Sequence, residues 1–371
     1  MLPRSNNSLY RSSDLSNELY VMLVIKLIIM CGCSIAILYS TALGNFEPWA
    51  LKQLITLLIF IPIVIITALV DFKIVLKCSY WLYGVSLLML LLAAAFGHKA
   101  MGAQRWLRIG AVNFQPSELM KLGLILALAR YYYNLHANEI GRLKHLIIPA
   151  IMIVVPVLFI IKQPNLGTAT ILIGIAVSMM FTAGLRLWKF VVAIIITLIA
   201  LPLVWMVLHD YQRQRVMTFI NPEADPMGAG YNIIQSIIAI GSGGLSGKGF
   251  LKGSQSQLSF LPEKQTDFIL SVIGEEFGFI GVSLVFCLTI GIIFLCYRIA
   301  FTSSNHFFRL IVIGVTTSFA LHAIINAGMI AGLLPVVGTP YPLLSYGGSN
   351  LAVFLLGFAL VFNKKLRAYK N

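Results

Sequence analysis

Apolar runs of membrane-spanning length alternate with short polar loops along almost the whole chain. The runs fall at residues 20–41, 51–70, 79–97, 118–135, 145–161, 167–184, 189–208, 267–297, 309–332 and 350–363. A bilayer core about 30 Å thick needs roughly 20 apolar residues in helical form. The pattern therefore predicts an all-α polytopic membrane protein of about ten transmembrane helices, forming a single integral-membrane domain over residues 1–371.

The first and eighth runs differ from the others. Residues 20–41 are too long for the apolar core of a signal peptide and lack a clear cleavage site, so we expect a span there. The eighth run, residues 267–297, would form about 45 Å of helix against a core of about 30 Å. It must tilt, bend or protrude, and Gly274, Gly278 and Gly281 offer places to bend.

Composition supports the membrane class. The 371 residues are 59% hydrophobic and 11% charged, whereas a soluble globular protein is about 25% charged. The net charge of +14 would suggest nucleic-acid binding in a soluble domain. Here the basic residues lie mainly in short loops, so we expect no nucleic-acid partner. The five cysteines lie in or beside apolar runs, which argues against a disulfide framework.

The distribution of Lys and Arg predicts the orientation. The polar tails at 1–18 and 364–371 share one side with the loops after even-numbered spans. That side carries Arg4, Arg11, Lys73, Lys77, Arg130, Arg142, Lys144, Arg186, Lys189, Arg298, Arg309, Lys364, Lys365, Arg367 and Lys370. The short loops of the other side carry only Lys52, Lys99, Arg105, Arg108 and Lys162. Short cytoplasmic loops are enriched in Lys and Arg, so both termini are predicted to be cytoplasmic and the long loop extracytoplasmic.

That long loop, residues 210–266 between spans 7 and 8, is the one extended polar interruption. Isoleucines at helical spacing from Ile233 to Ile238, followed by Gly241, predict a short amphipathic helix at the interface. The glycine-rich GSGGLSGKG that follows lacks the spacing of a P-loop. Lys248 in it is a candidate phosphate ligand, and a plain flexible turn is the alternative.

Several ionisable residues near the apolar runs are candidates for function. Asp267 stands where the long loop meets the eighth run, a position suited to chemistry on a lipid-borne substrate; an acid favoured in the first turn of a helix is the alternative. Glu118 and Lys121 share a helix face and either pair at the interface or line a polar cavity. Glu275 falls within a quadrant of Asp267 on a helix, so it either shares a cavity with Asp267 or binds a donor on another helix.

Nine motifs in order give the chain a close resemblance to a known family. They are GAQRWL (102–107), FQPSELMK (114–121), QPNLGT (163–168), HDYQRQRV (209–216), ADPMGAGYNIIQS (224–236), GSGGLSGKG (241–249), FLPEKQTDFI (260–269), GEEFG (274–278) and LLSYGGS (343–349). Together, among ten spans, they resemble the SEDS family of bacterial wall-building membrane proteins. HDYQRQRV favours the branch that acts in cell elongation and rod shape over the division branch.

The resemblance implies a peptidoglycan glycosyltransferase that joins lipid II units into glycan strands at the outer face of the cytoplasmic membrane. It assigns the essential acid to Asp267. It also implies a partner, a class B penicillin-binding transpeptidase of the PBP2 type, and other membrane proteins of the elongation complex. The family usually has Asp where this chain has Asn165, which bears on metal dependence more than on the reaction.

The reaction itself indicates which groups are needed. A lipid pyrophosphate is a good leaving group, so the main requirement is a base for the acceptor hydroxyl, and one carboxylate suffices for an inverting displacement. The departing pyrophosphate needs positive charge, and a divalent cation such as Mg²⁺ or Mn²⁺ is a further source of it. The candidate cations are Lys121, Arg105, Arg213, Arg215 and Lys248. We expect Glu118, Lys121, Arg105 and Ser345 to line the cavity, with Trp106 and Gln115 as its supporting wall.

Two other functions remain compatible with the sequence. Broken helices and intramembrane acids also suit a transporter that flips lipid II across the membrane, although the two halves show no obvious repeat. The third possibility is a non-catalytic scaffold for the transpeptidase.

Overall fold

The computed structural model describes residues 7–100, 103–109, 112–136, 138–207, 213, 217–218, 221, 229–258 and 260–368. Its long helices are α1 (Asn7–Thr41), α2 (Trp49–Leu69), α3 (Phe72–Phe96), α4 (Pro116–Tyr133), α5 (Ile147–Lys162), α6 (Leu166–Ala183), α7 (Leu187–Val207), α9 (Ala229–Gly243), α11 (Ile269–Phe301), α12 (His306–Ile330) and α13 (Gly348–Val361). Three short helical segments are η1 (Leu143–His145), α10 (Ser254–Gln257) and α14 (Lys364–Ala368).

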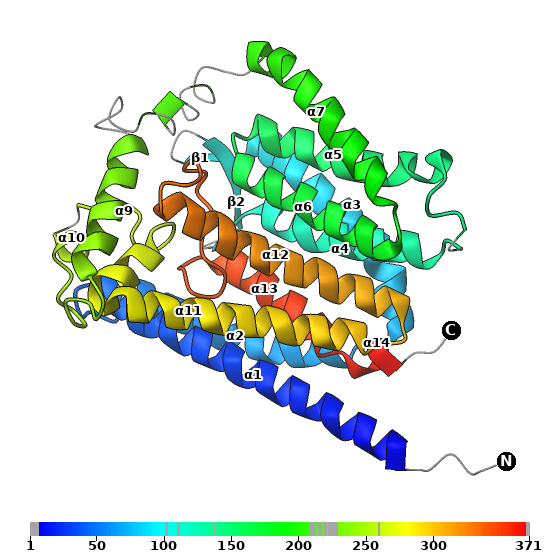
Figure 1. Cartoon of the computed structure of the whole chain (residues 1–371), viewed down its shortest axis with the longest axis horizontal. Helices are drawn as coiled ribbons and strands as arrows, with labels where there is room; N and C mark the ends of the chain where they lie inside the picture. The colour runs from blue at the N-terminus through cyan, green and yellow to red at the C-terminus, as the bar shows by residue number, and fades with distance from the viewer. Residues whose placement is uncertain are drawn as a thin grey trace.

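The helices confirm an all-α polytopic membrane architecture (Figure 1). Within the described residues, seven helices are long and apolar enough to span a bilayer. The remaining predicted positions are filled by α4, α7 and α13. They are not among the seven for two reasons. Helix α4 carries three charged residues, Glu118, Lys121 and Arg130, and the described apolar stretches of α7 and α13 are shorter than those of the seven.

Helix α1 begins at Asn7, within the polar tail predicted at residues 1–18, and its candidate membrane span begins at Asn17. One predicted boundary was wrong. The third span was expected to begin near residue 79 because Lys73 and Lys77 precede it, yet α3 begins at Phe72 and includes both lysines. Both are exposed, because long side chains on an outer helix face carry their charge to water while the stem stays apolar.

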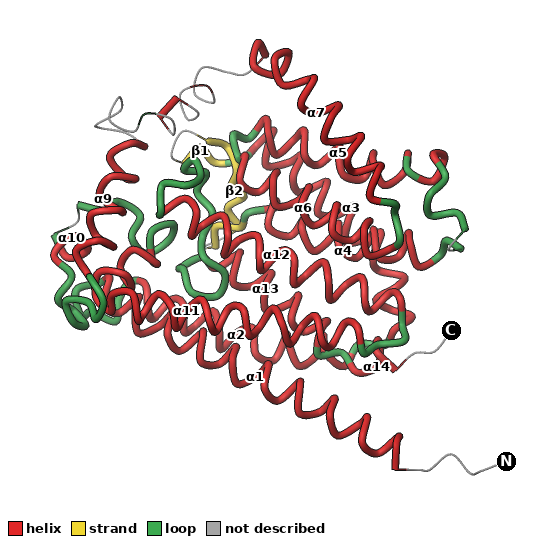
Figure 2. The backbone as a smooth tube through the Cα atoms, in the orientation of Figure 1, coloured by secondary structure: helices red, strands yellow, loops and turns green. Residues whose placement is uncertain are grey.

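A small antiparallel sheet occupies part of the segment 98–117, which was predicted to be a loop. Its strands are β1 (His98–Ala100), β2 (Ala103–Ile109) and β3 (Val112–Phe114), in the order β1-β2-β3. In Figure 2 the strands lie at the end of the bundle near α9, close to the loop that precedes α13. The sheet matters for function because β2 carries Arg105 and Trp106.

The core is built around α12 and α4. Helix α12 packs against α4, α6, α11 and α13, and α4 also packs against α3. Almost every side chain of α4 from Pro116 to Tyr132 is buried. A helix that is covered on all sides holds its polar residues in fixed surroundings, and α4 carries Glu118 and Lys121 at its first turns.

Helix α11 is broken, as its length and glycines predicted. Gly278 has φ 65° and ψ −158°, so the chain leaves the helical path there. The break frees main-chain groups, and the glycine-rich loop after α9 binds them. The Glu275 carbonyl accepts a hydrogen bond from the Lys248 N–H at 3.0 Å, and the Glu276 carbonyl accepts one from the Gly249 N–H at 2.9 Å. Buried main-chain groups must be paired, so this loop is part of the helix rather than a free turn.

The same loop also satisfies the far side of the break. The Phe279 and Ile280 N–H groups donate to the carbonyls of Gly244 and Leu245, at 2.9 and 3.1 Å. Contact is so close that a Cβ on Gly247 would lie 2.1 Å from the Glu276 carbonyl oxygen. The glycines therefore serve close main-chain approach.

The predicted amphipathic helix is confirmed as α9, which ends at Gly243 rather than Gly241. It packs against α11 and α12. Its Ser236 hydroxyl hydrogen-bonds to Ser271 at 2.7 Å and donates to the Ile330 carbonyl at 3.0 Å. The two residues that follow Ser236, Ile237 and Ile238, are exposed.

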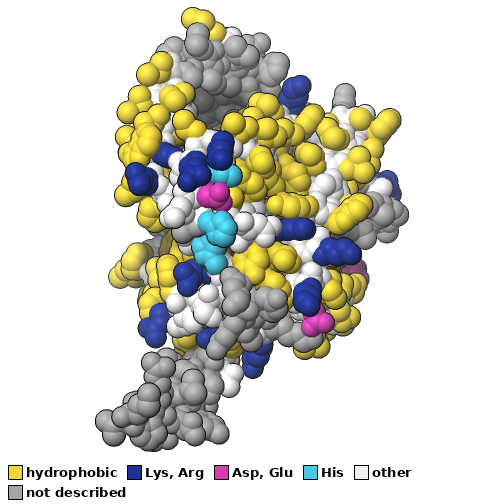
Figure 3. All heavy atoms as spheres, turned by 90° about the vertical axis from the view of Figure 1, so that its right-hand side faces the viewer, with side chains coloured by type: hydrophobic (Ala, Val, Ile, Leu, Met, Phe, Trp, Pro, Cys, Tyr) yellow, Lys and Arg dark blue, Asp and Glu magenta, His cyan; other side chains and the backbone are white. Residues whose placement is uncertain are grey.

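The bundle has two chemically different ends. In Figure 1, α1 begins and α14 ends at the end opposite to α9 and the sheet. Basic side chains gather on that end (Figure 3), and Arg142, Lys144 and Arg186 are exposed in its loops.

Candidate functional site

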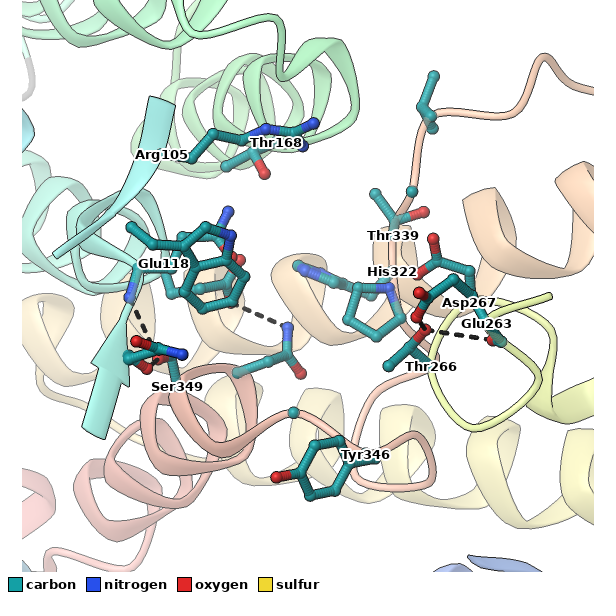
Figure 4. Close-up of a pocket in the computed structure, with 18 of the residues that line it drawn as sticks. Arg105, Glu118, Thr168, Glu263, Thr266, Asp267, His322, Thr339, Tyr346 and Ser349 are labelled. Atoms are coloured by element: carbon teal, nitrogen blue, oxygen red, sulfur yellow. Dashed lines mark hydrogen bonds between the residues drawn. The ribbon is translucent and has the colours of Figure 1, made fainter. Parts of the chain in front are cut away.

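A cavity of about 490 Å³ lies at the end of the bundle that carries the sheet. It is lined by Arg105, Trp106, Asn113, Gln115, Glu118, Thr168, Glu263, Thr266, Asp267, His322, Val336, Val337, Gly338, Thr339, Pro340, Tyr346, Gly347, Ser349 and Asn350. Figure 4 shows Asp267, Glu263 and Thr266 on one side of it, Glu118 and Ser349 on the other, and Arg105 above. The cavity therefore brings together residues from both halves of the chain.

Asp267 belongs to a tight turn just before α11. The Glu263 carbonyl accepts hydrogen bonds from the N–H groups of Thr266, Asp267 and Phe268, at 3.0, 3.1 and 3.4 Å. Glu263 itself has φ 52°, a left-handed conformation that is strained for a residue with a side chain. The turn thus fixes the backbone of Asp267 and points its carboxylate into the cavity.

Two further residues, Asn326 and Gly338, fix the position of Asp267. The Asn326 side-chain amide donates to the Asp267 carbonyl at 2.7 Å and to the Thr339 carbonyl at 2.8 Å. Gly338 has φ +69°, and a Cβ there would lie 3.3 Å from Asp267 Oδ2. Because Gly338 has no side chain, the carboxylate can lie directly against this segment.

The LLSYGGS segment forms the floor of the site, but Ser345 does not line the cavity as expected. Its hydroxyl is buried and accepts a hydrogen bond from the Tyr341 N–H at 2.9 Å. The next residue, Tyr346, lines the cavity, and its N–H donates to the Gln265 carbonyl at 2.9 Å. Burial raises the pKa of the Tyr346 phenol, which therefore stays neutral over a wide pH range.

Arg105, Trp106 and Gln115 line the opposite wall, at the positions that the sequence predicted. The Gln115 N–H donates to the Ser349 hydroxyl at 3.2 Å, and that hydroxyl donates to the Asn113 carbonyl at 3.3 Å. These bonds join the sheet to α13. Arg105 is the one Lys or Arg among the described residues that line the cavity.

Glu118 and Lys121 form a buried ion pair below this wall. Lys121 Nζ lies 2.7 Å from Glu118 Oε2 and 2.7 Å from His322 Nε2. His322 Nδ1 lies 2.7 Å from the Ser318 carbonyl, which only accepts, so Nδ1 carries a hydrogen. The Lys121 ammonium only donates, so Nε2 is an acceptor and His322 is neutral. Glu118 and His322 line the cavity, whereas Lys121 lies behind them.

Glu275, Lys248 and Arg213 were predicted as site residues but do not line the cavity. Glu275 does not share the cavity with Asp267; its carboxylate pairs with Lys248 Nζ at 2.8 Å. The reason is the glycine-rich loop, which fills the break in α11 and brings Lys248 to Glu275. Arg213 donates to the Met206 carbonyl at 2.9 Å and is not among the lining residues. Arg215 lies outside the described residues.

The described residues contain no cluster of three or more His, Cys, Asp and Glu side chains that could hold a metal ion. The position that differs from the family pattern, Asn165, is buried and caps α6 by accepting from the Thr168 N–H at 3.3 Å. An aspartate would make the same cap. A divalent cation remains a prediction.

Several lining residues were missed from the sequence. Glu263 and Thr266 lie within the same motif as Asp267, so their spacing was an available signal. His322 stands alone in an apolar run, and Asn350 stands at the start of one, directly after the LLSYGGS motif. Only the packing of α12 and α13 against α4 brings them near Glu118, whose carboxylate accepts from the Asn350 amide at 2.9 Å.

The fold and the cavity define a polytopic membrane protein with an acid-lined polar site among its helices. Over residues 15–370 the sequence matches the FtsW/RodA/SpoVE family of cell cycle proteins. The chain therefore belongs to this family, the SEDS family.

Named relatives agree with this assignment. The chain is 44% identical to the peptidoglycan glycosyltransferase MrdB of Escherichia coli K12 over 285 residues, 76% of each chain. A solved structure described as the structural coordination of polymerization and crosslinking by a peptidoglycan synthase complex matches with TM-score 0.81 and 30% identity, covering 94% of this chain and 98% of that one. The rod shape determining protein RodA of Thermus thermophilus matches with TM-score 0.71 and 27% identity, covering 94% and 97%.

Proposed function

We propose that this chain is a peptidoglycan glycosyltransferase that joins lipid II units into glycan strands, with Asp267 as the general base. The observation that carries the proposal is the placement of the Asp267 carboxylate. It lines a polar cavity opposite Arg105 in a chain that spans the membrane many times. The relatives that bear the name peptidoglycan glycosyltransferase support the reaction class.

The chemistry requires little more than this arrangement. The acceptor sugar hydroxyl attacks the anomeric carbon of the donor, Asp267 takes the hydroxyl proton, and the lipid pyrophosphate leaves with the electrons of the broken bond. A positioned base contributes about 10²–10⁴-fold to such a step. Glu263, beside Asp267, accepts a hydrogen bond from the Thr266 hydroxyl at 3.0 Å.

Arg105 supplies the positive charge that an anionic leaving group needs, in a cavity whose other charged lining residues, Glu118, Glu263 and Asp267, are acids. Arg105 faces the cavity, and an arginine binds phosphate oxygens in a bidentate manner. Glu118 is neutralised by Lys121 and His322 is uncharged, so neither adds a net charge that would repel or trap the pyrophosphate. We assign Arg105 as its ligand, with Trp106 and Gln115 shaping the wall beside it.

The setting of the reaction follows from the two ends of the bundle. The basic end that carries Arg142, Lys144 and Arg186 is the cytoplasmic one under the positive-inside rule. The cavity then opens to the outside of the cytoplasmic membrane. In the matching synthase complex, polymerization is coordinated with crosslinking. That coordination supports a class B penicillin-binding transpeptidase as partner here, and elongation with rod shape as the cellular role.

Polymerisation by purified protein tests the proposal. The chain and its transpeptidase partner would be reconstituted with lipid II, and glycan product would be measured for the wild type, Asp267→Asn and Asp267→Glu. We expect Asp267→Asn to lose at least about 100-fold in rate and Asp267→Glu to lose less, because its carboxylate is displaced but present. A lipid II flippase would move lipid without making polymer, and a scaffold would tolerate Asp267→Asn, so either result contradicts the proposal.

A further inference from the structure

Glu275 and Lys248 form an ion pair outside the cavity, between α11 and the glycine-rich loop. We infer that this pair is a positioning device for the reaction: it holds the turn that carries Asp267 in place and does not touch the substrate. The inference rests on the proposed function of Asp267. It replaces the expectation that Lys248 binds pyrophosphate and that Glu275 lines the cavity.

Glu275 is the centre of a dense set of hydrogen bonds. Its side chain is 0% exposed. It accepts from Lys248 Nζ at 2.8 Å, from the Ser254 hydroxyl at 3.3 Å, and from the N–H groups of Gln255 and Ser256 at 2.8 and 3.0 Å. Four donors around one buried carboxylate match an ionised acid. Breaking such a set leaves donors or charge unpaired in a buried place.

A continuous set of contacts leads from Glu275 to the turn of Asp267. Ser256 gives its N–H to Glu275, and its carbonyl accepts a hydrogen bond from Lys264 Nζ. Lys264 is the second residue of the turn from Glu263 to Asp267. Lys264 is partly buried, and this burial lowers the pKa of its ammonium group. Ser256 thus joins Glu275 to the turn through both of its main-chain groups.

The break in α11 makes this connection necessary. Because the helix is interrupted at Gly278, the segment from Ile269 to Phe277 is not held in line by the rest of α11. Main-chain hydrogen bonds to the loop at Lys248 and Gly249 replace that continuity. The Glu275 carboxylate adds side-chain bonds to the same loop, so the short segment and the loop form one body that ends at Asp267.

The geometry favours a positioning role for the Glu275–Lys248 pair over a role in binding the substrate. Neither Glu275 nor Lys248 is among the residues that line the cavity. Lys248 Nζ already binds Glu275 and the Ser254 hydroxyl, both at 2.8 Å. Loss of the pair should therefore change how well Asp267 is aligned rather than how tightly lipid II binds.

Kinetics of reconstituted variants test this. The variants are Lys248→Met, which keeps the apolar stem, Lys248→Arg, which keeps the charge, and Glu275→Gln. The matched control is Lys252→Met, which removes an exposed lysine from the same loop with the same change in net charge. All would be assayed in the complete complex with its transpeptidase partner, with lipid II as the varied substrate, well below the unfolding temperature of each variant.

We expect Lys248→Met and Glu275→Gln to lower kcat by about 10–100-fold, since a misplacement of about 1 Å can cost about 100-fold. KM for lipid II should stay within about twofold. Lys248→Arg should recover most of kcat, and Lys252→Met should match the wild type. A general loss of structure in Lys248→Met would not lower kcat alone, with KM unchanged and kcat restored in Lys248→Arg.

Two outcomes overturn the inference. A large rise in KM with kcat unchanged in Lys248→Met would make Lys248 a substrate ligand, and unchanged kcat and KM in that variant would remove any role for the pair. If Glu275→Gln does not fold, Lys248→Met decides the question, because Lys248 is 29% exposed. A wild-type chain that makes no polymer would instead contradict the proposed function, which keeps the two failures distinct.

Discussion

Asp267 is held from three directions by neighbouring residues. Glu263 turns the backbone before it, Asn326 binds its carbonyl at 2.7 Å, and Gly338 leaves room beside its carboxylate. Its candidacy came from the resemblance of FLPEKQTDFI to the family motif, because its position alone also fits an acid in the first turn of a helix. Asn326 could not be found that way, since one amide within an apolar helix carries no pattern.

The ion pair of Glu118 and Lys121 gives a prediction at the same scale. Both side chains are at most 5% exposed, so Lys121→Met leaves a buried carboxylate without its cation. Breaking one side of a buried pair costs about 3–5 kcal/mol. We expect a clear fall in Tm in detergent, measured by thermal unfolding.

Two comparisons make that prediction specific. The double variant Glu118→Gln/Lys121→Met should regain part of the lost stability, because no charge is then left alone. Lys52→Met, at an exposed site, should leave Tm unchanged. A double variant less stable than Lys121→Met would contradict the account of a buried pair.

At the scale of elements, the glycine-rich loop and α11 form one unit. The length of the eighth apolar run and its glycines predicted a bend, and Gly278 provides it. The filling of the break by GSGGLSGKG was not predictable, because main-chain pairing between segments about 30 residues apart leaves no periodic signal. The same limit explains why Lys248 and Glu275 were assigned to the cavity.

Close contact between α9 and α11 gives the prediction for this unit. A Cβ on Gly243 would lie 1.9 Å from the Gly274 carbonyl oxygen, whereas a Cβ on Gly241 has nothing within 4 Å. Gly243→Ala should therefore lower Tm strongly and reduce polymerisation. Gly241→Ala should keep or raise Tm, since alanine is favoured over glycine in a helix by about 0.5–1 kcal/mol. Equal Tm values for the two variants would refute the close packing described above.

The whole molecule separates a basic end from an end that carries the cavity. The polytopic membrane class and the order of the long apolar helices followed from the sequence because hydropathy over about 20 residues is a strong signal. The sheet that carries Arg105 and Trp106 did not, because its strands of three to seven residues lie in a polar segment with no clear alternation. Long-range packing of α4, α12 and α13 then completes a site that no single segment reveals.

Orientation in the membrane gives the prediction at this scale. In a background without native cysteines, Leu245→Cys and Arg186→Cys place exposed thiols at opposite ends of the bundle. A membrane-impermeant thiol reagent should label Leu245→Cys in intact cells from which any outer barrier has been removed. It should label Arg186→Cys only after the membrane is permeabilised. The reverse pattern would place the cavity in the cytoplasm.

The most direct test of the central claim is the initial rate of glycan polymerisation from lipid II by the Asp267→Asn variant, in vesicles with its transpeptidase partner. The account predicts a rate at least about 100-fold below the wild type, with lipid II binding unchanged. A rate equal to that of the wild type would show that the Asp267 carboxylate does not act as the base.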